Sequence, residues 1–216
     1  MEQRHNQDKH SLLFIIILGM LTAIGPLAID MFLPGLPELK NDFNTTTAHA
    51  QLTLSFFMIG LGIGNLFVGP ISDSLGRKKP LIIVMTIFTL ASLGIIFVHN
   101  IWLMIILRLL QGITGGGAAV ISRAIASDLY KGNELTKFLS LLMLVNGVAP
   151  VIAPALGGII LSVAVWRVIF VILTIFGILM VMGSLTKIPE SLSLEYRDSS
   201  GIKVIFQNFK SLLGTP

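Results

Sequence analysis

The stretch 69–80 reads GPISDSLGRKKP and concentrates charge in a chain that is otherwise apolar. It contains one acidic residue, Asp73, and three consecutive basic residues, 77–79. On either side, no Asp, Glu, Lys or Arg occurs over 43–72 or over 80–107. Each gap can hold at least one membrane-crossing helix, because about 20 apolar residues at about 1.5 Å each span about 30 Å of hydrocarbon. The stretch is therefore predicted to be a turn between two membrane-spanning helices.

The composition of the whole chain agrees with this prediction. Hydrophobic residues make up 54% of the 216 residues and charged residues 12%, with a mean hydropathy of +0.87, whereas a soluble domain carries about 25% charged residues. The apolar segments are continuous, which favours helices over the alternating strands of a membrane barrel. We predict an all-α integral membrane protein with six transmembrane helices, near 11–33, 48–71, 80–98, 101–124, 137–162 and 165–186.

The two ends of the chain are more polar than the predicted bundle over 11–186. Residues 1–10 are expected to form an N-terminal tail, and 187–216 a linker. Six apolar residues of the linker recur at helical spacing and predict an amphipathic helix on the membrane surface. They are Ile202, Ile205, Phe206, Phe209, Leu212 and Leu213. A disordered linker is the alternative.

Basic residues are distributed unequally between the two sides of the predicted bundle. Twelve of the fifteen Lys and Arg lie on one side, with only Lys40 and Arg167 on the other. The positive-inside rule then places both termini in the cytoplasm, and Trp102 and Trp166 at the outer interface, where aromatic residues are enriched. The net charge of +4 thus reflects topology rather than nucleic-acid binding, and the absence of Cys excludes thiol chemistry and thiolate metal sites.

Two ionisable residues, Asp30 and Arg108, lie well inside the apolar segments. Each would cost about 2.5–3.5 kcal/mol at the bilayer centre, so each needs a partner or water. They are predicted to lie at similar depth, which allows an ion pair or a shared aqueous cavity. Alternatively, Asp30 is an interfacial acid that reaches outer water, and Arg108 a structural arginine bonded to carbonyl groups.

Glycine and proline positions predict how the helices pack and where they end. Four glycines have the spacing that lets membrane helices approach closely; they are Gly60, Gly64, Gly112 and Gly116. Pro70 and Pro80 are expected to end the helices on either side of the charged turn. In the fifth segment, two prolines and two glycines predict a bend; these are Pro150, Pro154, Gly157 and Gly158.

The charged turn resembles the signature loop of the major facilitator superfamily of secondary transporters, Gly-x-x-x-Asp-(Arg/Lys)-x-Gly-Arg-(Arg/Lys). The matching residues are Gly69, Asp73, Gly76, Arg77 and Lys78, while Ser74 stands where a basic residue is usual. The resemblance implies a conformational latch, in which Asp73 and Arg77 join the cytoplasmic helix ends and Asp128 is a further partner.

Three further motifs resemble the drug/proton antiporters named Bcr/CflA within that superfamily. TAIGPLAIDMFLPGLPEL (22–39) is similar to their first-helix pattern, and RLLQGITGGGAA (108–119) to an Arg-x-x-Gln-Gly motif. GVAPVIAPALGG (147–158) is similar to the antiporter motif, with Ala153 replacing a glycine. The resemblance implies proton coupling and a substrate cavity at Asp30, Arg108 and Gln111. It also implies a hinge formed by Gly147, Pro150, Pro154, Gly157 and Gly158.

What the resemblance implies for the whole chain is the N-terminal six-helix half of such a carrier, built as a 3+3 inverted repeat. The expected activity is proton-coupled export of drugs or small amphipathic metabolites across a bacterial inner membrane, without cofactor or metal. Family members have twelve spans, so we expect a truncated or split gene. The alternatives are a half that pairs with a second polypeptide or another copy of itself, or a piece covering one half.

Other functions remain as alternatives or are excluded by missing motifs. A membrane remnant or scaffold without transport, and a proton-coupled nutrient symporter, are the alternatives to export. The sequence contains no His-Glu-x-x-His, no Gly-x-Ser-x-Gly and no Walker loop, which argues against an intramembrane enzyme or an ATP-driven pump.

Overall fold

The computed structural model describes residues 12–197, and this part of the chain is helical, without a strand. Six helices are long and apolar enough to cross a membrane, which confirms the predicted fold class. The first runs over Leu12–Asp42 and begins with α2 (Leu12–Asp30). The others are α4 (Thr47–Leu75), α5 (Lys78–Phe97), α6 (Ile101–Leu129), α7 (Gly132–Val163) and α8 (Arg167–Lys187). Between α2 and α4 lie the short helices η1 (Leu33–Gly35) and α3 (Leu36–Asp42), and η2 (Leu194–Tyr196) follows α8. The predicted tail over 1–10 and the apolar residues of the predicted amphipathic helix lie outside the described residues.

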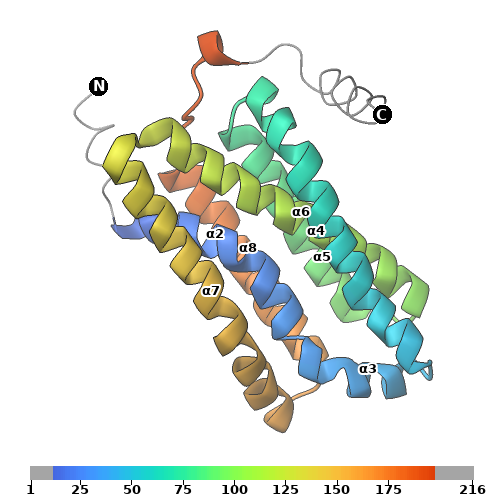
Figure 1. Cartoon of the computed structure of the whole chain (residues 1–216). Helices are drawn as coiled ribbons and strands as arrows, with labels where there is room; N and C mark the ends of the chain where they lie inside the picture. The colour runs from blue at the N-terminus through green and yellow to red at the C-terminus, as the bar shows by residue number, and fades with distance from the viewer. Residues whose placement is uncertain (1–11, 198–216) are drawn as a thin grey trace, which may run out of the picture.

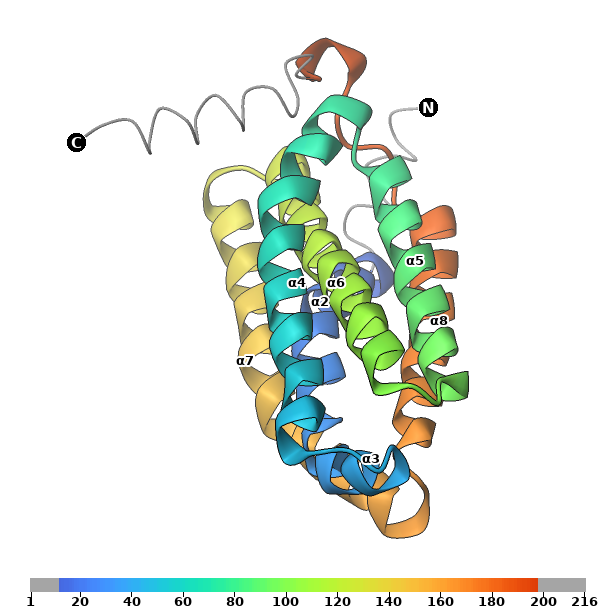
Figure 2. The same cartoon turned by 90° about the vertical axis from the view of Figure 1, so that its right-hand side faces the viewer.

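The long helices pack in three pairs along a common axis. Helix α4 lies against α6, α5 against α8, and α2 against α7 (Figures 1 and 2). Helices α2 and α6 join the pairs and are the most buried, whereas α7 leaves most of its surface uncovered. One end of the bundle carries the α4–α5 and α6–α7 turns and is called the basic end below. Helix α3 lies at the opposite end.

Four glycines set the distance between α4 and α6. A methyl group on Gly60 or Gly64 would clash with the α6 backbone, and one on Gly112 or Gly116 with the α4 backbone. The two backbones therefore touch, as the small-residue spacing predicted. This close crossing fixes the position of α6, which carries Arg108, Gln111, Arg123 and Asp128.

The turn between α4 and α5 is shorter than the positions of Pro70 and Pro80 predicted. Helix α4 continues through Pro70 to Leu75, and Pro80 lies in the first turn of α5, so the prediction that both prolines end helices was wrong. Proline is tolerated in a first turn because its missing donor is not needed there, and in membrane helices whose neighbours support the chain. Helix α4 ends instead at Gly76, whose φ of +90° favours glycine.

The prediction for Trp166 was also wrong. Its side chain is 1% exposed, because the rings of Phe32, Phe43 and Phe170 pack against the indole. The indole Nε1 donates to Asp42 at 3.1 Å and the backbone N–H of Trp166 donates to Glu38 at 3.1 Å. Trp102, at the start of α6, is 57% exposed. Trp166 is thus a core residue that holds α3 in place, and only Trp102 of the two can face a membrane interface.

Candidate functional site

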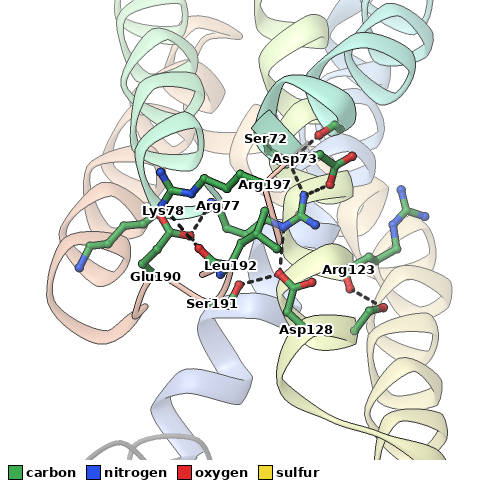
Figure 3. A network of polar contacts seen from close by, with 12 residues as sticks. Ser72, Asp73, Arg77, Lys78, Arg123, Asp128, Glu190, Ser191, Leu192 and Arg197 are labelled. Atoms are coloured by element: carbon green, nitrogen blue, oxygen red, sulfur yellow. Dashed lines mark hydrogen bonds and ion pairs between the residues drawn. The ribbon is translucent and has the colours of Figure 1, made fainter. Parts of the chain in front are cut away.

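The first cluster of functional residues surrounds Arg77 in the α4–α5 turn (Figure 3). The Arg77 side chain is largely buried and its Nη1 lies 2.5 Å from Asp73 Oδ1. Nη1 also donates to Ser72 Oγ at 2.7 Å, and Nε donates to Asp128 Oδ2 at 2.9 Å. Because Asp73 belongs to α4 and Asp128 to α6, Arg77 ties the ends of these helices together. In the structure, Asp73 and Asp128 thus both contact the guanidinium of Arg77.

The charge of Arg77 is maintained by its partners. Burial alone lowers the pKa of its guanidinium, but the hydrogen bonds and negative charges of Asp128 and Asp73 outweigh burial and raise the pKa above its ordinary value. The guanidinium is therefore charged at every physiological pH.

Glu190, which follows α8, is a member of this cluster that sequence reasoning missed. Its carboxylate accepts hydrogen bonds from the backbone N–H groups of Arg77, at 2.7 Å, and Lys78, at 3.4 Å. These N–H groups open α5, where the helix dipole favours a negative charge. Gly76 is required here, since a methyl group on it would lie 2.5 Å from Glu190 Oε2. No motif or spacing in the sequence indicates that Glu190 contacts Arg77.

Two more contacts bind the chain after α8 to the same cluster. Ser191 Oγ donates to Asp128 Oδ2 at 2.8 Å, and Arg197 Nη2 lies 3.7 Å from Glu190 Oε2. Lys78 Nζ donates to the Leu185 carbonyl of α8 at 2.9 Å. We call Ser72, Asp73, Arg77, Asp128, Glu190 and Ser191 the Arg77 cluster. It joins α4, α5, α6 and the segment after α8 at the basic end.

The second group of residues surrounds Arg108, which is fully buried. Its Nη1 donates to the Ala28 carbonyl of α2 at 3.1 Å and to Gln111 Oε1 at 2.8 Å. Gln111 Nε2 in turn donates to Ser92 Oγ of α5 at 2.7 Å. Arg108 and Gln111 thus form one polar chain across α2, α6 and α5.

Three aromatic rings enclose the Arg108 guanidinium. Its Cζ lies 4.7 Å from the ring centres of Phe32 and Phe57 and 5.4 Å from that of Phe170, within reach of cation–π attraction. The Nε and Nη2 atoms of Arg108 are buried and have no hydrogen-bond partner within residues 12–197. Because an unpaired buried donor is unfavourable, these two atoms are available to a partner that this conformation does not supply.

Asp30 ends α2 and is partly exposed. It lies two residues beyond Ala28, so the predicted similarity in depth to Arg108 holds. Over the described range 12–197, however, no ion pair joins Asp30 to Arg108 and no hydrogen bond reaches its side chain. The structure therefore does not contain the predicted pair in this conformation.

The predicted hinge residues of α7 have different surroundings. Helix α7 runs without interruption through Pro150 and Pro154, and the predicted bend stays a prediction. A methyl group on Gly157 would clash with the Met31 backbone, whereas Gly147 and Gly158 have open space around them. Gly157 thus packs α7 against the α2–η1 turn.

A bundle of six helices able to cross a membrane, with a buried arginine and a charged cluster joining helix ends, defines a multi-pass α-helical membrane protein. The chain belongs to the Major Facilitator Superfamily, whose family model matches residues 18–216. It is 44% identical to the MFS-type transporter YdgK of Bacillus subtilis over 97% of this chain and 53% of that protein. It is 33% identical to the bicyclomycin resistance protein homolog of Haemophilus influenzae over 94% of this chain and 51% of that protein.

More distant matches agree with this assignment. The chain is 29% identical to multidrug resistance protein D of Escherichia coli, over 74% of this chain and 41% of that protein. Its fold matches the crystal structure of the human organic anion transporter MFSD10 with a TM-score of 0.69 at 15% identity, covering 89% of this chain and 52% of that one. The chain spans about half the length of the two relatives from Bacillus and Haemophilus.

Proposed function

We propose that the chain forms the N-terminal six-helix half of a proton-coupled drug exporter of a bacterial inner membrane. A second six-helix half, on the same or another polypeptide, would complete the substrate cavity. The names of the relatives that concern bicyclomycin and multidrug resistance support drugs as substrates. The chain covers only about half of the Bacillus and Haemophilus relatives, which supports a second half.

The observation that carries the proposal is the arrangement of Asp30 and Arg108. Asp30 lies at the C-terminal end of α2, where the helix dipole opposes a negative charge, and it has no partner within the described residues. Arg108 of α6 has two buried donors without a partner. It also bonds to the carbonyl of Ala28, which lies two residues before Asp30 on α2. We propose that the ionised Asp30 binds these donors in one state of the carrier and that protonation releases it.

The Arg77 cluster, at the basic end of the bundle, would act in a different step of the transport cycle. With the basic end in the cytoplasm, the bonds from Arg77 to Asp128 and from the α5 N-terminus to Glu190 would hold the helix ends together in the outward-facing state. Opening toward the cytoplasm would require these bonds to break. The cluster would therefore set the balance between the two states, while Asp30 couples that balance to protons.

The test uses a chimera in which this chain is followed by the remaining part of the Bacillus subtilis relative. Everted vesicles containing the chimera are acidified inside by respiration, bicyclomycin is added, and proton loss is followed with a fluorescent acridine. We expect bicyclomycin to release protons from vesicles with the unmodified chimera. Asp30→Asn should abolish this release, and Glu195→Gln, a charge loss at an exposed residue after α8, should not.

Three outcomes of these measurements would contradict the proposed function. Proton release that is unchanged in Asp30→Asn would refute the role of Asp30. No release with the unmodified chimera, when the intact Bacillus relative responds in the same vesicles, would refute export of bicyclomycin through this half. Accumulation of bicyclomycin by whole cells in place of exclusion would indicate a symporter.

A further inference from the structure

Two of the three rings around Arg108 are supported by a single side chain, Trp166, at the end of the bundle opposite the basic end, called the α3 end below. The ring centre of Trp166 lies 6.2 Å from that of Phe32 and 5.8 Å from that of Phe170, both edge to face, an arrangement that aromatic pairs prefer. The two phenylalanine rings lie 5.2 Å from each other. All three side chains are buried. Trp166 therefore fixes where the two phenylalanine rings meet the guanidinium.

Trp166 is held in turn by helix α3, which lies at this end of the bundle (Figure 2). Asp42 accepts a hydrogen bond from the indole Nε1, and Glu38 accepts one from the Trp166 backbone N–H, both at 3.1 Å. The ring of Phe43 also packs against the indole, with 5.8 Å between the ring centres. A buried indole N–H needs an acceptor, and here the acceptor belongs to a side chain that is 39% exposed. A residue near the surface thus helps to hold a fully buried ring.

Arg167 fixes the carboxylate of Asp42. Its Nη1 forms an ion pair with Asp42, while its Nε and Nη2 donate to the carbonyls of Ile96 and Val98, each at 3.1 Å. These carbonyls lie at the C-terminal end of α5, where carbonyl groups lack partners within the helix. The guanidinium of Arg167 also lies 4.5 Å from the Trp166 ring centre, within reach of cation–π attraction. We call Glu38, Asp42, Trp166 and Arg167 the Trp166 brace. It joins α3, α5 and the start of α8.

Exclusion of water has a direct consequence for Arg108. Its Nε and Nη2 atoms are buried and have no hydrogen-bond partner within residues 12–197. Water that reached them would occupy these donors, whereas in a dry site of low dielectric constant their attraction for a carboxylate is stronger. We infer that the Trp166 brace positions Arg108: it closes the ring of aromatic side chains against water from the α3 end and leaves the two donors free for a carboxylate. The inference rests on the proposed function for the identity of that carboxylate, Asp30, and adds the residues that keep its partner dry.

The experiment measures whether a reagent reaches the Arg108 guanidinium in the purified chain in nanodiscs. Butanedione in borate buffer modifies accessible arginine side chains, and peptide mass spectrometry gives the rate at each arginine. Arg123 is exposed and serves as the reference for reactivity. Arg77 is largely buried at the basic end and reports general loosening of the bundle. In the unmodified chain, we expect Arg108 to react much more slowly than Arg123.

Asp42→Ala removes both the acceptor of the indole and the ion-pair partner of Arg167. We expect the rate at Arg108 to rise about tenfold relative to the exposed reference, the effect of a loss of about 1.4 kcal/mol in the free energy of local opening. The rate at Arg77 should stay low. Lys40→Gln removes a charge from the same short helix, at a residue outside the Trp166 brace, and should leave the rates unchanged.

Substitutions of Trp166 separate the ring from its hydrogen bond. Trp166→Ala removes the support of the two phenylalanine rings and should raise the rate at Arg108 at least as much as Asp42→Ala does. Trp166→Phe keeps an aromatic ring in this position and should restore most of the protection. Trp102→Ala removes an exposed indole at the start of α6, so this matched control should not change the rate.

Several results would overturn the inference. One is a rate at Arg108 in the unmodified chain that equals the rate at Arg123, and another is the absence of a rise in Asp42→Ala. A rise shared equally by Arg77 would also overturn it, because the variant would then loosen the whole bundle. If Trp166→Ala does not fold, Asp42→Ala carries the test, since it leaves the buried ring in place. The labelling requires no transport, so the vesicle assay can fail while the labelling supports the brace, and the reverse result is equally clear.

Discussion

Glu190 and Arg77 are 113 residues apart in sequence, yet the Glu190 carboxylate accepts a hydrogen bond from the Arg77 backbone N–H at 2.7 Å. The acid thereby closes the N-terminal end of α5 from a segment that follows the last membrane helix. The side chain of Arg77 bonds to Asp128 and Asp73 instead, so one residue joins three acids, one through its backbone and two through its guanidinium. The segment after α8 is thus part of the bundle at the basic end.

Glu190→Ala should lower the stability of the chain. The change leaves the N–H groups of Arg77 and Lys78 without their acceptor and removes a negative charge from a helix N-terminus. Loss of a helix cap costs about 1 kcal/mol. Thermal unfolding of the purified chain in detergent, followed by circular dichroism, should show a lower midpoint. Glu195→Ala removes the same charge from an exposed side chain nearby and is the control; equal midpoints for the two variants would contradict the cap.

Asp128→Asn should destabilise the chain more than Asp73→Asn. Asp128 is 17% exposed and bonds to both Arg77 and Ser191, whereas Asp73 is 47% exposed and meets Arg77 alone. Hydrogen bonds to charged groups in buried surroundings contribute about 1.5–3 kcal/mol, while exposed ion pairs contribute about 0–1 kcal/mol. Unfolding midpoints of the two variants, measured side by side, test the order. The reverse order would show that Asp73 is the main partner of Arg77.

Gly64→Ala should disrupt the crossing of α4 and α6. A methyl group there would clash with the Ile113 carbonyl, so the helices must separate, which costs about 1–3 kcal/mol. Gly62→Ala is the matched control on the same helix, because nothing lies within 4 Å of the added methyl group. Alanine favours a helix over glycine by up to about 1 kcal/mol, so Gly62→Ala should be neutral or stabilising. Similar midpoints for both variants would refute the close crossing.

Gly157→Ala and Gly158→Ala separate packing from flexibility in α7. Only Gly157 touches another backbone, at Met31, so Gly157→Ala should lower the unfolding midpoint while Gly158→Ala should not. A hinge that needs both glycines predicts instead that both variants slow proton release in the chimera described above while both keep their stability. Unfolding midpoints and release rates of the same two proteins therefore distinguish a packing glycine from a hinge.

Much of the fold could be predicted because lipid imposes simple rules. Long gaps between charges locate the membrane segments, because a charged side chain is unfavourable in hydrocarbon. These segments form helices because every backbone polar group must be satisfied within the segment. The spacing of Gly60 and Gly64 predicted a close helix crossing, and the structure confirms it. Pro70 and Pro80 misled the prediction of helix ends, because a proline removes one donor but does not decide whether neighbouring helices support the chain beyond it.

The candidate site was only partly visible in the sequence. Asp30, Arg108 and the charged turn could be found because ionisable residues are rare and unfavourable in apolar segments. The partners of Arg108 and of the charged turn could not be found, because Glu190 and the three rings around Arg108 come from segments far apart in the chain. The sequence by itself thus determined which segments enter the membrane, through local hydropathy. Which side chains meet was decided only by helix packing, because those contacts depend on the relative position and rotation of several helices at once.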